Sequence, residues 1–155
     1  MSKKGENKFL YQLQHVFKNR FIDVAIAFWC KYKEKNSYNT ITIADVKQVG
    51  DNKFSFVRRM DGDGKIEYEI IRYERQKQKI VADLFLSEDK KRNLAERCEY
   101  LHNSVKGGVE YRLSVFKENW CKFIRTRAFN WGIGKMEDTL QKIQEQQKNA
   151  KPASL

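Results

Sequence analysis

The most apolar stretch of the chain runs from Arg20 to Tyr32 and reads RFIDVAIAFWCKY. Its charged residues are Arg20, Asp23 and Lys31. Apolar side chains cover most of its faces at helical spacing, and a helix that is apolar on most faces is a buried one. One stripe at this spacing consists of Ile22, Ile26 and Trp29. We therefore predict a buried helix against which the rest of the chain packs.

Much of the remaining sequence alternates between apolar and polar residues, which is the period of a half-buried strand. The alternation predicts about seven strands, within residues 9–17, 41–46, 54–57, 66–73, 80–86, 94–102 and 109–115. Its phase shifts between Ile70 and Ile71, which predicts a β-bulge. Short turns join the strands, so we expect an antiparallel meander in which each strand has one wet and one dry face.

A helical period replaces the alternation from about Trp120. Gly132 and Gly134 each cost about 1 kcal/mol relative to Ala in a helix, so we expect a kink or a close backbone contact there. The sequence thus predicts an α+β fold of the helix-grip type, with a curved antiparallel sheet, a buried N-terminal helix and a long C-terminal helix. We assign residues 1–147 to this single domain and residues 148–155 to a polar tail.

The chain carries 31 Lys and Arg residues against 20 Asp and Glu residues, a net charge of +11. This balance favours an anionic partner: nucleic acid, acidic lipid headgroups or an acidic protein surface. Lys and Arg are scattered and no aromatic RNA-binding motif is present, so we expect no nucleic-acid partner. Residues 1–8 lack an apolar segment, and we expect neither a secretory signal nor an ordinary mitochondrial presequence there.

The sequence contains no constellation of catalytic side chains, and we expect a protein that is not an enzyme. Glu67 and Glu69 alternate on one strand face without a nearby base, which is typical of surface charge. The three cysteines are widely spaced, form no metal-binding pattern and lie among apolar residues, so we interpret each as a small buried hydrophobe. We expect no metal and no cofactor, apart from the possibility of a bound phospholipid.

Three segments resemble the PRELI family of phospholipid-transfer proteins of the mitochondrial intermembrane space. The first is the helix with its Phe28-Trp29 pair and Tyr32, the second is Arg58-Arg59 at the end of a strand, and the third is 96–100, ERCEY. The resemblance covers residues 8–147 and implies the fold described above. It also implies an apolar cavity between helix and sheet, whereas the alternation alone is equally compatible with a filled core.

Two departures from the family pattern bear on function. The Tyr-Pro-Asn-Pro sequence that follows the helix in the family is replaced by Tyr32 and Lys33-Glu34-Lys35. The lid segment after the Arg pair is replaced by the short turn 61–64, DGDG. A lid covers the acyl chains during transit through water. We therefore expect a non-catalytic accessory subunit of a complex at the inner membrane; the alternative is an active carrier of phosphatidic acid or phosphatidylserine.

The resemblance places the protein in the intermembrane space, peripheral to the inner membrane. The partners that it implies are other subunits, anionic phospholipid or the membrane surface, and a small twin-cysteine chaperone. Cations able to pair with a lipid phosphate are Arg58, Arg59, Lys65, Lys122, Arg125 and Arg127. The predicted cavity wall consists of Ile26, Phe28 and Trp29.

Overall fold

The computed structural model describes residues 10–30, 40–50, 53–62, 65–85, 94–116 and 121–149. At residues 40–45, 49, 56–62 and 65–67 it describes the backbone alone. The elements are, in chain order, β1 (Tyr11–Phe17), α1 (Phe21–Cys30), β2 (Thr40–Gly50), β3 (Lys53–Gly62), β4 (Lys65–Glu74), β5 (Lys79–Phe85), β6 (Leu94–Asn103), β7 (Gly108–Val115) and α2 (Lys122–Asn149).

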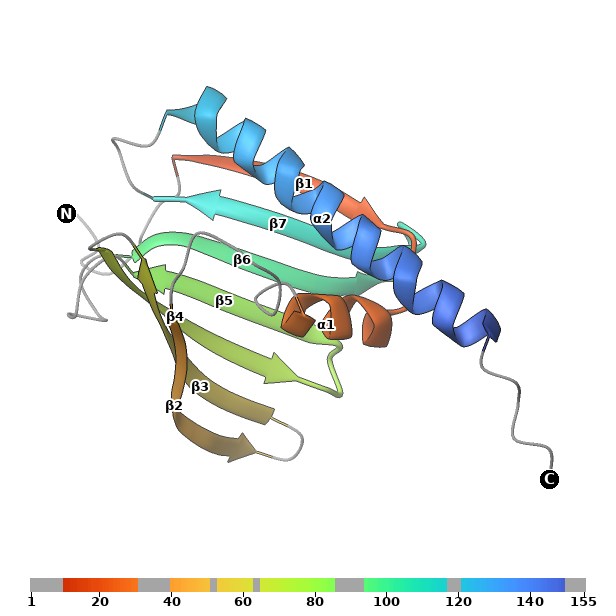
Figure 1. The fold of residues 1–155 in the computed structure, drawn as a ribbon, viewed down its shortest axis with the longest axis horizontal. Coiled ribbons are helices and arrows are strands. Elements are labelled where there is room, and N and C mark those ends of the chain that lie inside the picture. Colours follow the sequence, from red (N-terminus) through yellow and green to blue (C-terminus); the bar gives the residue numbers. More distant parts are fainter. Residues whose placement is uncertain are drawn as a thin grey trace.

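All seven strands form one antiparallel sheet in the order β1-β7-β6-β5-β4-β3-β2. Strands β2 to β7 therefore form a meander, and β1 closes the other side by pairing with β7. Figure 1 shows a twisted sheet with α1 and α2 on the same face, and α2 running diagonally over β1 and β7. The predicted α+β architecture, with its seven-strand meander and long C-terminal helix, is confirmed.

Helix α1 is short, and the face that it buries differs from the predicted stripe. The buried residues Phe21, Val24, Ala25 and Phe28 follow the spacing of one helix face. On the predicted stripe, Ile22 is 50% exposed and Ile26 is 40% exposed. Both stripes are apolar in sequence, so only the position of the sheet decides which one is buried. The prediction of a helix buried on most of its faces is therefore wrong on the side of Ile22 and Ile26.

Strand β5 is buried on both faces, which corrects the prediction of one wet face per strand. It is the middle strand of the sheet, and every residue from Ile80 to Phe85 is buried. Ile80 and Ala82 face the helices within the core. The opposite face is covered by long side chains from the neighbouring strands, among them Arg97, whose guanidinium binds Asp83.

The bulge predicted between Ile70 and Ile71 is wrong. Strand β4 pairs with both of its neighbours in continuous register through this point. Ile71 is fully buried on the helix side, and Ile70 is half-buried on the other side, opposite Asp83. The change of phase in the sequence therefore reflects apolar side chains on both faces of the strand. Register shifts occur instead in β2 and beside Leu84 in β5.

Helix α2 runs from Lys122 to Asn149 and extends two residues into the predicted tail. Phe129, Met136 and Leu140 form its buried face. A Cβ at Gly132 or Gly134 would meet no atom within 4 Å, so the predicted close backbone contact is wrong. Both glycines lie within one continuous helix, which Figure 1 shows as α2.

The connection between β3 and β4 is short. Gly62 pairs with Lys65, which leaves residues 63 and 64 between the paired strands. A lid segment of the kind expected from the PRELI family has no place at this point of the chain.

Replacing Phe28 tests the core assignment. Phe28 has no exposed surface and belongs to the cluster that joins α1 to the sheet. Phe28→Ala should lower the free energy of unfolding by about 3 to 5 kcal/mol, because it leaves a cavity. Ile26→Ala, on the exposed side of the same helix, should cost about 1 kcal/mol or less. Chemical denaturation measures both, and equal losses would contradict the assignment.

Candidate functional site

The interface between the two helices and the sheet is the region where a helix-grip protein would hold a ligand, and four aromatic rings cross it here. The Phe28 ring of α1 lies edge-on to Tyr100 of β6, with 5.3 Å between their centroids. Tyr100 stacks on Tyr111 of β7 at 4.6 Å, and Tyr111 stacks on Phe129 of α2 at 4.9 Å. These distances are those of rings in direct contact. The rings therefore join α1 to α2 through the two strands between them.

Other side chains extend this cluster to both sides. Phe17 of β1 stacks on Tyr111 at 6.1 Å, and Phe21 lies 6.2 Å from Tyr73 of β4. The Tyr111 hydroxyl is 3.7 Å from the sulfur of Cys98. Desolvation by burial raises the pKa of Tyr111 well above its ordinary value, so its hydroxyl is neutral at physiological pH. The ring cluster is an apolar core with little polar character.

The three predicted wall residues lie in different surroundings. Phe28 is fully buried against Tyr100, as described above. Trp29 is half-buried and packs on the edge of the core, 5.2 Å from the Phe28 ring. Ile26 is 40% exposed and lies outside the core. Only Phe28 and Trp29 therefore contact the interface between helix and sheet.

Three of the six predicted phosphate-binding residues lie on β3 and β4. Arg58 pairs with Glu69 in the strand register, Arg59 with Tyr68, and Lys65 with Gly62. The side chains of Arg58, Arg59 and Lys65 lie outside the described residues. Their role as headgroup contacts stays a prediction.

The other three cations lie on α2, where Lys122 and Arg125 approach Tyr11 and Arg127 lies on the outer side of the helix. The Lys122 ammonium is 5.9 Å from the ring of Tyr11. Arg125 is half-buried and forms an ion pair with Glu96 of β6. The Arg127 guanidinium lies 6.0 Å from the Phe123 ring. The fold does not bring these three cations together around one phosphate.

A buried carboxylate connects the two helices. Asp23 is 4% exposed and accepts two hydrogen bonds from Arg20, at 3.1 and 3.2 Å. It accepts a third from Gln147 near the end of α2, at 3.2 Å. Because a buried charge is costly without partners, this arrangement fixes α2 against the start of α1. Sequence reasoning missed it because Gln147 lies in a polar segment without an apolar face of its own.

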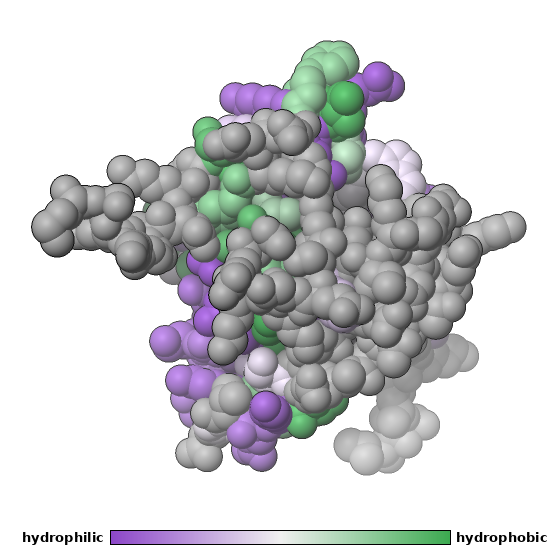
Figure 2. All heavy atoms as spheres, turned by 90° about the vertical axis from the view of Figure 1, so that its left-hand side faces the viewer, coloured by the Kyte–Doolittle hydropathy of each residue, from purple (hydrophilic) through white to green (hydrophobic). Residues whose placement is uncertain are grey.

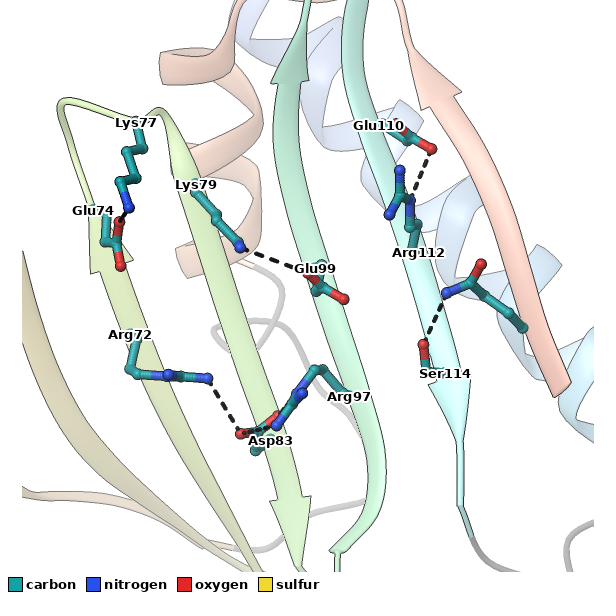
Figure 3. Close-up of polar contacts among 11 residues, drawn as sticks. Arg72, Glu74, Lys77, Lys79, Asp83, Arg97, Glu99, Glu110, Arg112 and Ser114 are labelled. Atoms are coloured by element: carbon teal, nitrogen blue, oxygen red, sulfur yellow. Dashed lines mark hydrogen bonds and ion pairs between the residues drawn. The ribbon is translucent and has the colours of Figure 1, made fainter. Parts of the chain in front are cut away.

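The face of the sheet opposite the helices carries paired charges, shown across β4 to β7 in Figure 3. Asp83 is 8% exposed and accepts hydrogen bonds from Arg97 at 2.6 and 3.2 Å. Arg72 lies on its other side at 3.6 Å. Lys79 approaches Glu99 at 3.8 Å. Much of the positive charge on this face is therefore balanced within the protein.

Glu110 of β7 is the most deeply buried acid of this face, with 2% of its surface exposed. It accepts hydrogen bonds from Arg112 at 2.8 Å, Lys106 at 2.9 Å and Asn103 at 3.2 Å. The hydrogen bond from Arg112, followed by the one from Lys106, lowers the pKa of Glu110 to about 2. Glu110 is therefore a structural anion and not a proton donor at physiological pH.

The start of α2 exposes large apolar side chains to solvent. Phe123 is 69% exposed, Ile124 64% and Trp131 67%. Figure 2 shows hydrophobic atoms flanked by hydrophilic ones at the top of the view, where α2 begins. The helical period that begins near Trp120 does not separate the buried face of this helix from the exposed one. The apolar positions of this half surround the helix, which indicates that some of them are exposed without telling which ones.

Cys121 precedes this helix and is exposed, so its interpretation as a buried hydrophobe is wrong. Backbone N–H groups of Ile124 and Phe123 hydrogen-bond its sulfur and lower the pKa of the thiol. Cys30 and Cys98 are half-buried.

The described residues contain no group of three or more His, Cys, Asp and Glu side chains placed to hold a metal ion. Neither described helix is long and apolar enough to cross a membrane. We find no matching family model and no matching curated protein for the chain. The resemblance to the PRELI family stays a hypothesis that rests on the three sequence segments quoted above.

The paired charges make a pH prediction. The pKa of Glu110 is lower in the folded protein than in the unfolded chain. The stabilisation that ionised Glu110 gives through Arg112 and Lys106 is therefore present above pH 4.5 and is lost as the pH falls toward 2. Glu110→Gln should cost about 1 to 2 kcal/mol at pH 7, because solvent partly screens both cations, and the cost should shrink below pH 4.5.

Urea denaturation of the unchanged protein and of Glu110→Gln at several pH values measures this difference in the free energy of unfolding. Glu99→Gln is the control, because its partner Lys79 lies 3.8 Å away and neither side chain is deeply buried. A cost for Glu110→Gln that stays constant down to pH 2 would contradict the assigned role.

Proposed function

We propose that this protein is a non-catalytic accessory subunit of a larger assembly, and that its own side chains occupy the space that a lipid carrier would leave for its ligand. The observation that carries this proposal is the series of rings from Phe28 through Tyr100 and Tyr111 to Phe129. Phe28 has no exposed surface, Tyr100 has 1%, Phe129 has 7%, and Tyr111 is half-buried against the core. Protein interiors packed in this way have few voids larger than a water molecule.

A phospholipid carrier needs room for two acyl chains and a cover over them. Burying acyl chains gains about 0.8 kcal/mol per methylene, and this gain depends on excluding water. Here the rings lie between α1, the sheet and α2, and β3 connects to β4 through residues 63 and 64 alone. Both features favour a packing module over a shuttle.

The remaining parts of the proposal rest on the resemblance to the PRELI family and on charge. The resemblance favours the mitochondrial intermembrane space and a complex at the inner membrane. The net charge of +11 favours acidic partners, either neighbouring subunits or anionic lipid. A twin-cysteine chaperone is a further partner that the family likeness suggests.

A lipid-transfer assay tests the filled core. The purified full chain, incubated with vesicles containing phosphatidic acid or phosphatidylserine, should transfer no more lipid to acceptor vesicles than a blank without protein. Mass spectrometry of the native protein should detect the bare chain of 18.5 kDa. Stoichiometric bound phospholipid, or transfer well above the blank, would overturn the filled core and favour the carrier function.

The accessory role needs a separate test. The full chain carrying an affinity tag, expressed in the cells where it occurs and released with mild detergent, should migrate in a native gel as part of an assembly much larger than its own 18.5 kDa. Migration of all the protein as a free small species would contradict the accessory role.

A further inference from the structure

The start of α2 carries a surface that the packing of the fold does not use. Phe123, Ile124 and Trp131 are each more than 60% exposed, and each belongs to the half of the helix that precedes Met136. Single exposed apolar residues are common on proteins. Three large ones within about two turns of one helix mark an interaction site. We call these three residues, together with Arg127 and Lys135, the α2 ridge.

The ridge lies on the side of α2 that faces away from the sheet. At 100° per residue, Ile124, Arg127, Trp131 and Lys135 project roughly opposite to the buried Phe129. From Phe123 to Lys135 the ridge is about 18 Å long at 1.5 Å per residue. It is convex, because a helix packed on a sheet presents its outer side chains as a ridge.

Positive charge accompanies the apolar residues. The Arg127 guanidinium lies 6.0 Å from the ring of Phe123, and the Lys135 ammonium lies 5.4 Å from the ring of Trp131. Arg127 and Lys135 lie on the ridge itself, whereas Arg125 pairs with Glu96 and Lys122 lies over the ring of Tyr11. Residues 122–136 include no acid, and residues 137–149 include three. Charge and exposed apolar surface therefore coincide on the first half of the helix.

We propose that the α2 ridge docks the protein on the surface of an anionic lipid bilayer, with the helix lying in the plane of the interface. Apolar side chains enter the boundary between headgroups and acyl chains, and the long stems of Arg127 and Lys135 let their charges stay at the phosphates. A bilayer accepts a convex ridge without a shaped pocket. Nucleic acid would complement the positive charge of the ridge but would offer no apolar environment for the aliphatic Ile124.

This inference deepens the proposed function, on which its setting at a membrane rests, by naming the surface that makes the contact. Its evidence is separate from the ring cluster. A protein with a filled core can bind vesicles without extracting lipid. The vesicle-binding assay therefore tests the ridge alone, and the lipid-transfer assay tests the filled core alone.

Co-sedimentation with vesicles tests the proposal. The purified full chain should bind vesicles of phosphatidylcholine mixed with phosphatidylserine, should bind pure phosphatidylcholine weakly, and should be released by high salt. The double variant Phe123→Ser, Trp131→Ser should weaken binding more than about a hundredfold, because it removes the two aromatic side chains that would enter the bilayer. Val105→Ser, at a residue 94% exposed in the turn between β6 and β7, should bind as the unchanged protein does.

A second pair of variants separates local charge from net charge. Arg127→Gln with Lys135→Gln should weaken binding about thirtyfold. Each cation near an anionic bilayer contributes about 1 kcal/mol, and every 1.4 kcal/mol changes the affinity about tenfold. Lys142→Gln with Lys148→Gln removes the same charge from the other half of α2 and should weaken it far less. All of the substituted residues are exposed, so circular dichroism should show unchanged folding.

Tryptophan fluorescence reports on the ridge itself. Anionic vesicles should shift the emission to shorter wavelength, and Trp131→Phe should retain binding while losing most of the shift. Failure of the unchanged protein to bind anionic vesicles at low salt would overturn the proposal. Equal binding by the ridge variants and their controls would overturn it as well. If the unchanged protein binds an acidic protein that the ridge variants do not bind, and no form binds vesicles, the partner of the ridge is a protein and not a bilayer.

Discussion

The stacking of Tyr100 on Tyr111 is the contact on which the rest of the fold depends. Their centroids are 4.6 Å apart, and each ring also contacts a helix, Phe28 of α1 or Phe129 of α2. The two strands thereby hold both helices at fixed positions on one face of the sheet. Asp23 adds a polar contact between the same helices at the far end of α2. The space between helix and sheet is thus an aromatic core.

The distribution of charge explains how a strongly basic chain can still have a well-paired sheet. On the face opposite the helices, Asp83 and Glu110 each have at least two cationic partners and little exposed surface. A buried carboxylate needs such partners, whereas its partners can stay partly in water. On the outer side of the first half of α2, Arg127 and Lys135 instead lie beside exposed aromatic rings, and residues 122–136 include no acid. This division separates a face that stabilises the fold from a helix that is free to meet an anionic surface.

The strands could be predicted because alternation directly reports one wet and one dry face. In the turn between β6 and β7, Gly107 adopts a φ of 73°, a conformation that glycine tolerates. The buried side of α1 could not be predicted, since both of its stripes are apolar and the sheet alone selects Phe28 over Ile26. Strand β5 was predicted at residues 80–86, but its wet face was not found, because Arg97 reaches over that face from a neighbouring strand. The ring cluster depends on register, which pairs Tyr100 with Tyr111. For the candidate site, the sequence identified Phe28 and Trp29 and missed the exposure of Trp131, because a helical period does not tell which apolar residues lack a partner.

Nuclear Overhauser effects at the four rings test the filled core most directly. In the purified full chain, we predict strong effects between the Phe28 and Tyr100 ring protons and between the Tyr111 and Phe129 ring protons, as their centroid distances of 5.3 and 4.9 Å require. These effects should be unchanged after incubation with phospholipid vesicles. Effects from these rings to acyl-chain protons, accompanied by loss of the contacts between rings, would contradict the filled core.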